Sequence, residues 1–341
     1  MPKATSQKLS RQHAPAVAAA SSRPGKGKAA AAGEEGGAAG GGGGKNHLFD
    51  TAKFGQHILM NPLVAQGLNA TLPLTMQQAN LKQTDVVLEV GPGTGNLTVR
   101  ILEQCRKVVA VEMDPRMASE VTKRVLGKPE QRKLELIIGD FVKADLPYFD
   151  VCISNTPYQI SSPLVFKLLS HRPIIRTAVL MFQREFALRL CATPGSNLWC
   201  RLSANVQLFA TVEHIMKVGK ANFRPPPLVE SSVVRMSPKN PPPAVRFEEF
   251  DGLNRVVFSR RNKTIRACFQ AKGVKDLLEA NYKTWCSETG KLLEDGFDFS
   301  QYIETILVDS GFGENRAAKM DVADLLKCVR LYPLFGDKAC R

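Results

Sequence analysis

The stretch Asp85-Val-Val-Leu-Glu-Val-Gly-Pro-Gly-Thr-Gly95 decides the fold of this chain. Residues 85–90 form a short apolar run bounded by turn residues, which is typical of a strand buried in a parallel sheet. The glycines at 91, 93 and 95 then mark a strand-to-helix turn where the backbone can approach a ligand closely. Because Asn96 stands where the third glycine of an NAD-binding G-x-G-x-x-G turn would fall, the spacing does not favour a dinucleotide.

Apolar runs and helical segments alternate after this turn. Helices are predicted over 96–105 and 115–126 and after Ser161-Ser162-Pro163, and the predicted strands are 85–90, 108–112, 134–138, 149–154 and 177–182, with a late pair over 206–218 and 229–236. Strands that alternate with helices imply right-handed crossovers. We therefore expect an α/β fold with an open, doubly wound, Rossmann-like sheet.

Two carboxylates stand at the predicted ends of the next two strands. Glu112 follows Gly91 by about 20 residues, a spacing that suits an acceptor for both hydroxyls of a ribose. Asp140 follows the third strand and is placed to accept a hydrogen bond from an adenine amino group. Either residue alone would be read as a solvated strand-end carboxylate. Together with the glycine turn they favour an adenosine ligand without a pyrophosphate, namely S-adenosylmethionine.

The fourth predicted strand runs into Asn155-Thr156-Pro157-Tyr158. The Asn155 side-chain oxygen and the Thr156 backbone carbonyl can both accept hydrogen bonds from the NH2 group of a nucleobase. Those two acceptors favour a nitrogen whose lone pair faces an electrophilic methyl group, and the Tyr158 ring offers a face on which a flipped base can stack. Asn-x-Pro also starts ordinary turns, so the evidence lies in its position relative to the glycine turn.

The charge and cysteine content narrow the class of protein further. A net charge of +14 and a pI near 9.5 indicate a polyanionic partner, for which RNA or DNA is the better interpretation. The eight cysteines form no C-x-x-C pair and no Cys/His ligand spacing, so we expect neither a structural zinc site nor a disulfide framework, and a reducing compartment. An uninterrupted apolar run long enough to span a membrane is absent from the sequence.

Composition divides the chain into three predicted parts. Residues 1–45 are low-complexity Ala, Gly, Ser and Lys, which predicts a disordered basic tail, with a transit peptide as the alternative. Residues 46–237 carry the α/β pattern. A proline cluster at 238–243 precedes residues with helix-like apolar spacing, so 238–341 is predicted to be a small helical domain.

Several long segments resemble one known family, the rRNA adenine dimethyltransferases of the KsgA type. They are Phe54-Gly-Gln-His-Ile-Leu-Met-Asn-Pro62, Glu89-Val-Gly-Pro-Gly-Thr-Gly-Asn96, Val111-Glu-Met-Asp114, Gly139-Asp140, Asn155-Thr-Pro-Tyr-Gln-Ile-Ser-Ser-Pro163 and Phe223-Arg-Pro-Pro-Pro-Leu-Val-Glu-Ser-Ser232. The eukaryotic nuclear branch is matched further by Pro238-Lys-Asn-Pro-Pro-Pro243, Glu249-Phe-Asp-Gly-Leu253 and Phe258-Ser-Arg-Arg-Asn-Lys-Thr-Ile-Arg266. The similarity runs from about Asn46 to the C-terminus.

The resemblance implies a substrate and a place of action. It implies transfer of methyl groups to the N6 atoms of two adjacent adenosines in the 3′-terminal hairpin loop of small-subunit (18S) rRNA. It also implies a part in pre-rRNA processing and small-subunit assembly within pre-ribosomal particles, in the nucleus and nucleolus, by a protein that is a monomer outside the particle. The open alternatives are a non-catalytic mitochondrial transcription or assembly factor of the same fold, and an adenine DNA methyltransferase.

The resemblance also assigns residues to the site. The cofactor set is His57, Leu59, Gly91, Gly93, Gly95, Glu112, Asp140 and Asn155, and the catalytic set is Asn155, Thr156, Pro157, Tyr158 and Phe223. Tyr158 and Phe223 would flank the target base. For Phe223 we expect a rigid exposed loop, because a triple proline follows it, rather than packing in the core. The family usually has Leu at the position of Thr156 and Lys at that of Leu228.

A basic stretch lies beyond the proline boundary. Arg260, Arg261, Lys263 and Arg266 cluster in a part of the chain whose net charge, with these four included, is near zero. A solvated helix face is the simpler interpretation of such a cluster. Because the clustering is local, we expect it to contact rRNA phosphates.

Overall fold

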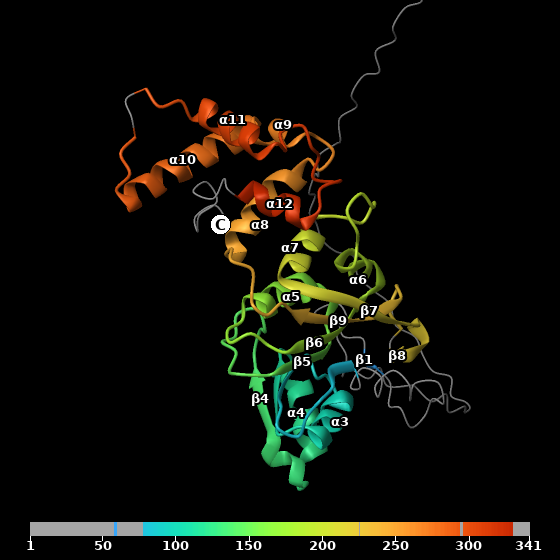
Figure 1. The fold of residues 1–341 in the computed structure, drawn as a ribbon. Helices are drawn as coiled ribbons and strands as arrows, with labels where there is room; N and C mark the ends of the chain where they lie inside the picture. Colours follow the sequence, from blue (N-terminus) through green and yellow to red (C-terminus); the bar gives the residue numbers. More distant parts are fainter. Residues whose placement is uncertain (1–57, 60–77, 225, 294–295, 330–341) are drawn as a thin grey trace, which may run out of the picture. The chain divides into compact units, whose positions relative to one another are not determined.

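The structure is a computed structural model that describes residues 78–224, 226–293 and 296–329 and the backbone of Ile58–Leu59 (Figure 1). Contacts within the chain separate residues 1–45 from residues 46–341, and every described residue belongs to the second group. The predicted basic tail, residues 1–45, therefore lies outside the described residues.

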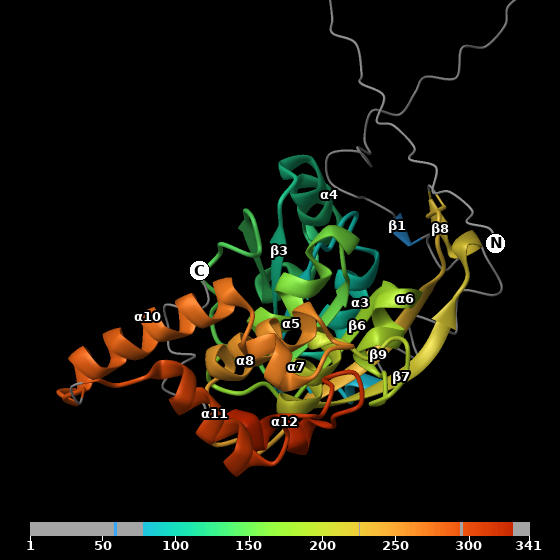
Figure 2. The ribbon, with the colours of Figure 1, turned by 90° about the horizontal axis from the view of Figure 1, so that it is seen from above.

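The described strands form a seven-stranded sheet and a two-stranded one. The large sheet has the order β4-β3-β2-β5-β6-β9-β7, in which β4, β3, β2, β5 and β6 are parallel and β9 is antiparallel to both of its neighbours. The strands are β2 (Val86–Val90), β3 (Lys107–Glu112), β4 (Leu134–Ile138), β5 (Val151–Asn155), β6 (Thr177–Gln183), β7 (Ala210–Val218) and β9 (Ser231–Pro238). The small sheet pairs β1 (Ile58–Leu59) with β8 (Phe223–Arg224), beside one end of β7 and β9 (Figure 2).

Helices cover both faces of the large sheet, as the doubly wound prediction requires. They are α3 (Asn96–Gln104), α4 (Pro115–Val125), α5 (Ser161–Ser170), α6 (Arg184–Leu190) and α7 (Arg201–Phe209). Val86, Leu88 and Val90 belong to the same hydrophobic cluster as residues of α5 and α7, whereas Val87 packs in a second cluster with residues of α3. Because side chains alternate along a strand, β2 is buried on both faces, and its five residues are all buried.

Most predicted elements are confirmed to within about two residues, but one is wrong. The predicted strand 206–218 begins only at Ala210, because residues 201–209 form α7. In residues 201–209 apolar residues alternate with polar ones, as in a strand. Two of these polar residues, Ser203 and Asn205, are nevertheless fully buried, since Ser203 Oγ donates to the Arg189 carbonyl at 2.6 Å and Asn205 Nδ2 donates to Asp251. The helical face is therefore partly polar, which conceals its period.

The part of the chain beyond β9 is helical, as predicted. It contains α8 (Phe247–Ser259), α9 (Ile265–Phe269), α10 (Lys272–Thr289), α11 (Phe299–Ser310) and α12 (Val322–Cys328), which lie beyond α7 in Figure 1. Short 3-10 helices cover Pro129–Lys133, Tyr158–Ile160 and Lys220–Asn222. Phe250, Leu253 and Leu325 join the hydrophobic cluster that also contains Leu88. The boundary at 237/238 stays a prediction.

Candidate active site at the strand ends

The glycine turn after β2 adopts a backbone that side chains would strain. Gly91, Gly93 and Gly95 have φ angles of 68°, 56° and 78°. A Cβ atom added to Gly91 would lie 3.1 Å from two ring carbons of Pro157, which is too close without a shift. Glycine is therefore required at 91 by both conformation and space. The same contact brings the glycine turn directly against the Asn155–Tyr158 segment.

Hydrogen bonds between strand ends fix this arrangement. The Ser154 hydroxyl at the end of β5 donates to the Val90 carbonyl at 2.7 Å, and the Gly91 amide donates to the Val111 carbonyl of β3 at 2.9 Å. The Gly139 amide after β4 donates to the Glu112 carbonyl at 2.9 Å. The carboxyl ends of the parallel strands β4, β3, β2 and β5 thus meet at one edge, where ligands bind in open α/β sheets. Ser154 is not among the predicted site residues, because the sequence pattern around it offers no distinct signal.

Glu112 lies at the end of β3 with its carboxylate turned toward the glycine turn. Its Oε2 atom accepts from the Gly93 amide at 3.1 Å and its Oε1 atom accepts from the Asp114 amide at 3.0 Å. The residue is 7% exposed, and burial raises the pKa of its carboxyl while these amides oppose the rise. Each carboxylate oxygen has a second lone pair, so the group can still accept from a ribose hydroxyl. The glycine cradle and this strand-end carboxylate fit an adenosine ligand.

Asp140 begins the loop that follows β4. Its Oδ1 atom accepts from the Val142 amide at 2.9 Å, and its side chain is half-buried. The ammonium group of Lys167, from α5, donates to the carbonyls of Phe141 at 2.7 Å, Val142 at 3.0 Å and Ala144. A lysine ammonium has three donors, and all three are used here to hold the loop next to Asp140. Burial lowers the pKa of Lys167. A single lysine in an apolar helix gave no sign of this role in the sequence.

The Asn155–Tyr158 segment leaves β5 and enters α5. Asn155 is half-buried at the strand end, whereas Thr156 is 2% exposed, with its amide donating to the Met181 carbonyl at 3.2 Å and its hydroxyl to Ser154 Oγ at 3.2 Å. The Thr156 side chain therefore faces the interior, where it can replace the Leu common in the family. Tyr158 is half-buried, and burial raises the pKa of its phenol.

Phe223 corrects one expectation. It is 2% exposed and packs in the cluster that contains Met181, Val218 and Val233, so the exposed ring predicted for this position is wrong. Packing between β8 and the large sheet decides where the ring lies. Leu59 pairs with Phe223 through the backbone of β1, and His57 lies outside the described residues. Leu228, in the same loop, is 92% exposed.

Glu89, the residue two positions before the glycine turn, carries a buried carboxyl group. It is 1% exposed, and burial raises its pKa to about 8, with the neighbouring Glu112 charge adding to the rise and the Thr98 hydroxyl opposing it. The Oε2 atom has no hydrogen-bond partner among the described residues. Glu89 is therefore protonated at neutral pH and adds no negative charge beneath the glycine turn.

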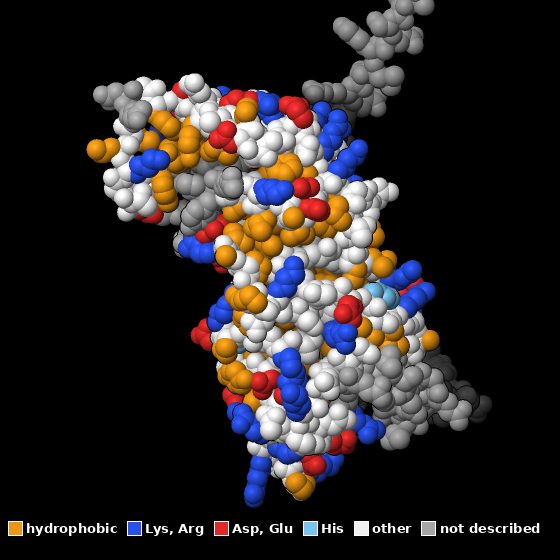
Figure 3. All heavy atoms as spheres, viewed as in Figure 1, with side chains coloured by type: hydrophobic (Ala, Val, Ile, Leu, Met, Phe, Trp, Pro, Cys, Tyr) orange, Lys and Arg blue, Asp and Glu red, His pale blue; other side chains and the backbone are white. Residues whose placement is uncertain are grey.

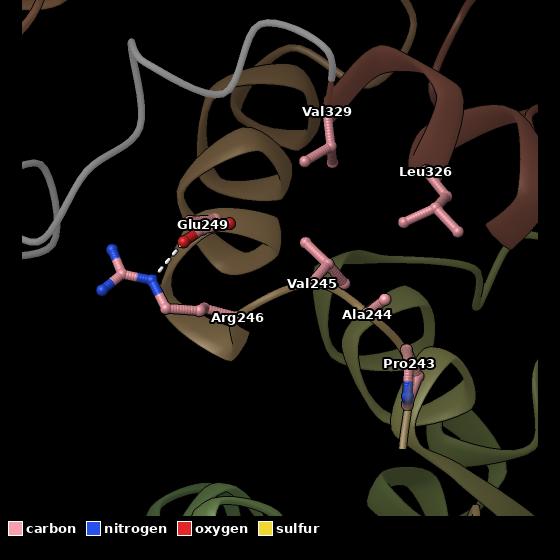
Figure 4. Close-up of a pocket in the computed structure, with 7 residues that line it drawn as sticks. All are labelled: Pro243, Ala244, Val245, Arg246, Glu249, Leu326 and Val329. Atoms are coloured by element: carbon pink, nitrogen blue, oxygen red, sulfur yellow. Dashed lines mark hydrogen bonds and ion pairs between the residues drawn. The ribbon is translucent and has the colours of Figure 1, made fainter. Parts of the chain in front are cut away.

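A groove lies beside α8 and α12. It has a volume of about 730 Å³ and is lined by Pro243, Ala244, Val245, Arg246, Glu249, Leu326 and Val329 (Figure 4). Figure 3 shows hydrophobic side chains gathered over this region of α8 and α12. None of the predicted site residues lines the groove, so we do not place the reaction there.

Neither a metal centre nor a membrane span is found in the described part of the chain. Among residues 78–224, 226–293 and 296–329, no three His, Cys, Asp or Glu side chains gather as metal ligands would. None of the helices in those ranges combines the length and the apolar character that a bilayer crossing needs.

The strand order, the glycine turn against Asn155–Tyr158 and the strand-end carboxylate define the class of this protein, a Rossmann-like S-adenosylmethionine-dependent methyltransferase. A model of the family described as ribosomal RNA adenine dimethylase matches residues 49–294. The chain belongs to this family. It is accordingly an rRNA methyltransferase that uses S-adenosylmethionine.

Individual relatives agree with this assignment over most of their length. A dimethyladenosine transferase of Schizosaccharomyces pombe is 60% identical over 293 residues, which cover 86% of this chain and 93% of the relative. The dimethyladenosine transferase of Saccharomyces cerevisiae is 56% identical, with 86% and 92% covered. A crystal structure of a dimethyladenosine transferase from Plasmodium falciparum shares 42% identity at a TM-score of 0.71, covering 80% of this chain and 96% of that one. The 23S rRNA methyltransferase ErmE, at 24% identity and a TM-score of 0.53, shares the fold.

Proposed function

We propose that this chain dimethylates small-subunit (18S) rRNA at the N6 atoms of two adjacent adenosines in the 3′-terminal hairpin loop. We further propose that it acts in the nucleus and nucleolus on pre-ribosomal particles, where it contributes to pre-rRNA processing. The observation that carries the catalytic part is the contact between the glycine turn and the Asn155–Tyr158 segment, where a Cβ atom on Gly91 would lie 3.1 Å from the ring of Pro157. Relatives named dimethyladenosine transferase, up to 60% identical, support the choice of adenosine.

Gly91, Gly93, Gly95, Glu112 and Asp140 would hold the cofactor. The glycine backbone leaves room beside Pro157, Glu112 offers carboxylate oxygens to the ribose, and Asp140 offers one to the adenine amino group. The Lys167 ammonium keeps the backbone of the Asp140 loop in place from α5. The bound cofactor would supply an electrophilic methyl group at this edge of the sheet.

Asn155 and Thr156 would orient the adenine N6 amine. Because the Thr156 side chain is buried, that residue acts through its backbone carbonyl, and the Asn155 side-chain oxygen accepts the second N–H. The nitrogen lone pair would then face the methyl group. Formation of the N–C bond would break the bond between the methyl carbon and the sulfonium sulfur, which leaves as a neutral thioether, and the surplus amine proton would pass to water. Orientation and proximity supply most of the rate, and no general base is required.

The test combines binding with methyl transfer. Wild-type protein should form N6,N6-dimethyladenosine in small-subunit rRNA from cells lacking the enzyme, and not in duplex DNA, as measured by mass spectrometry. Glu112→Ala should weaken cofactor binding in calorimetry by at least about tenfold, since the variant lacks a charged acceptor that contributes roughly 1.5–3 kcal/mol. Glu135→Ala is the matched control, because Glu135 on the neighbouring strand β4 pairs with Lys107 at 2.5 Å and is half-exposed.

Asn155→Ala should transfer methyl groups about 100-fold more slowly even when the cofactor is saturating, because the target amine is no longer oriented. Methylation of large-subunit RNA or DNA in place of small-subunit rRNA would contradict the proposed substrate. Normal turnover by Asn155→Ala would remove Asn155 from the catalytic set.

A further inference from the structure

Tyr158 is joined to a residue far away in the sequence. Its hydroxyl lies 2.6 Å from the hydroxyl of Ser231, 73 residues along the chain, and Ser231 is fully buried at the start of β9. Because β9 is hydrogen-bonded to β6 at Gln183 and to β7 at Val218 on its two sides, the Ser231 backbone is held in the sheet. The far end of the Tyr158 ring is thus tied to a strand.

The residue before Ser231 is held as firmly. The Glu230 carboxylate contacts the Lys217 ammonium at 2.7 Å and the Arg184 guanidinium at 3.5 Å, and its backbone carbonyl accepts from the Arg184 amide at 2.9 Å. The Lys217 contact lowers the pKa of Glu230, so the carboxylate stays charged at neutral pH. Three elements, α6, β6 and β7, therefore meet at the point where the chain enters β9.

The near end of Tyr158 is also fixed. The Ser161 hydroxyl donates to the Tyr158 carbonyl at 2.9 Å, and Pro157 restricts the backbone before it. With both ends held, the hydroxyl contact with Ser231 fixes the direction of the axis that runs from Cβ to the hydroxyl, and with it the place of the ring beside the base site. We propose that Ser231 is a positioning residue for methyl transfer, which sets the angle at which Tyr158 meets the target base. This inference rests on the proposed function, in which the Tyr158 ring would stack on the target base as the sequence predicts.

The proposal predicts a defined pattern in a double-mutant cycle. Ser231→Ala and Tyr158→Phe each remove the same hydrogen bond and keep the aromatic ring. Each should lower kcat for methyl transfer to small-subunit rRNA by about three- to tenfold, the usual range for one positioned hydrogen bond. The KM for S-adenosylmethionine should not change. The double variant should be no slower than either single variant, since the same bond can be removed only once.

Ser232→Ala is the matched control. Ser232 is the next residue of β9 and equally buried, but its hydroxyl has no hydrogen-bond partner among the described residues. This variant should keep wild-type kcat. If Ser231→Ala fails to fold, Tyr158→Phe still tests the contact, because Tyr158 is only half-buried and its substitution removes the same hydrogen bond. The quantity measured is again kcat.

Three outcomes are informative. A lowered kcat in both single variants, with no further decrease in the double variant, supports the positioning role. A kcat in Tyr158→Phe equal to that of the wild type, or additive decreases in the double variant, overturns the positioning role. The proposed function is unaffected by that result as long as the wild-type protein methylates small-subunit rRNA. If wild-type protein itself transfers no methyl group to small-subunit rRNA, the proposed function fails first.

Discussion

Glu89 illustrates how one buried group couples the fold to pH. Its pKa is raised to about 8 in the folded protein, against an ordinary value near 4.5. Between these two pH values the folded chain keeps a proton that the unfolded chain releases. The free energy of unfolding contributed by this group therefore falls as pH rises, by about 1.4 kcal/mol for each pH unit. The contribution is largest below pH 4.5 and is gone by about pH 8.

Glu89→Gln should remove this dependence, because the amide has a similar shape and does not titrate. The free energy of unfolding is measured in urea for the variant and the wild type at several pH values from about 5 to 8. The variant should gain stability relative to the wild type by roughly 1.4 kcal/mol for each pH unit. Glu135→Gln, at a half-exposed carboxylate of β4, serves as the control for the exchange of a glutamate for a glutamine elsewhere in the sheet. Parallel curves for Glu89→Gln and wild type would contradict the raised pKa.

At the scale of elements, α7 and α8 are joined by a buried polar network. The Arg201 guanidinium donates to Asp251 Oδ1 at 2.7 Å and to Asp251 Oδ2 at 2.6 Å, and Asn254 Nδ2 donates to Asn205 Oδ1 at 2.6 Å. Asp251 is 6% exposed, so removal of its carboxylate would leave Arg201 and Asn205 without their acceptor. Arg255 contacts the same carboxylate from the rim, at 3.5 Å.

Asp251→Ala should therefore destabilise the protein by about 3 kcal/mol, the low end of the cost of breaking a buried ion pair, because Arg201 keeps partial contact with water. Arg255→Ala should cost about 0–1 kcal/mol, as exposed pairs do. Urea unfolding of both variants measures the two costs. Equal destabilisation by the two substitutions would show that the buried ion pair of Arg201 and Asp251 contributes no more to the free energy of unfolding than the exposed contact of Arg255.

The same network explains what the sequence could and could not predict. Continuous apolar runs identified the parallel strands, because strands buried on both faces have no polar positions to confuse the pattern. Helix α7 was missed because Ser203 and Asn205 occupy its buried face, satisfied by partners in α6 and α8. The strand-end positions of Gly91 and Glu112 could be predicted, because the apolar run and the turn residues that mark each strand end are adjacent in the sequence. Ser231 was not, because its partner Tyr158 is brought to it by the sheet alone.

At the scale of the whole molecule, the basic stretch of the helical part divides into two kinds of residue. The Arg261 guanidinium donates to the carbonyls of Asn197 at 2.9 Å and Trp199 at 3.0 Å, and Arg266 pairs with Glu304 and with Glu314 at 2.9 Å. These two are used within the fold. Arg260 and Lys263 are exposed, so they are the pair we now expect to contact rRNA phosphates.

The affinity for small-subunit rRNA should depend less steeply on salt in the variant Arg260→Ala/Lys263→Ala. The slope of log affinity against log salt concentration should become shallower by about 0.7–0.9 for each phosphate that is no longer neutralised. Its melting temperature and cofactor affinity should stay at wild-type values. Arg261→Ala should instead lower the melting temperature, because two carbonyls are left without a charged donor. Salt titrations followed by fluorescence anisotropy, with thermal unfolding alongside, separate the two groups. An unchanged salt slope in the first variant would exclude these side chains from RNA binding.

The position of β9 between β6 and β7 constrains the order in which the chain can fold during synthesis. Within the described residues, β7 pairs only with β9, yet it leaves the ribosome about 20 residues earlier. Until Ser231–Pro238 has emerged, β7 has no strand partner and the edge of β6 stays open. Nascent chains halted before residue 231 should therefore be sensitive to protease and prone to aggregation, whereas chains that include β9 can close the sheet and, with it, bring Ser231 to Tyr158.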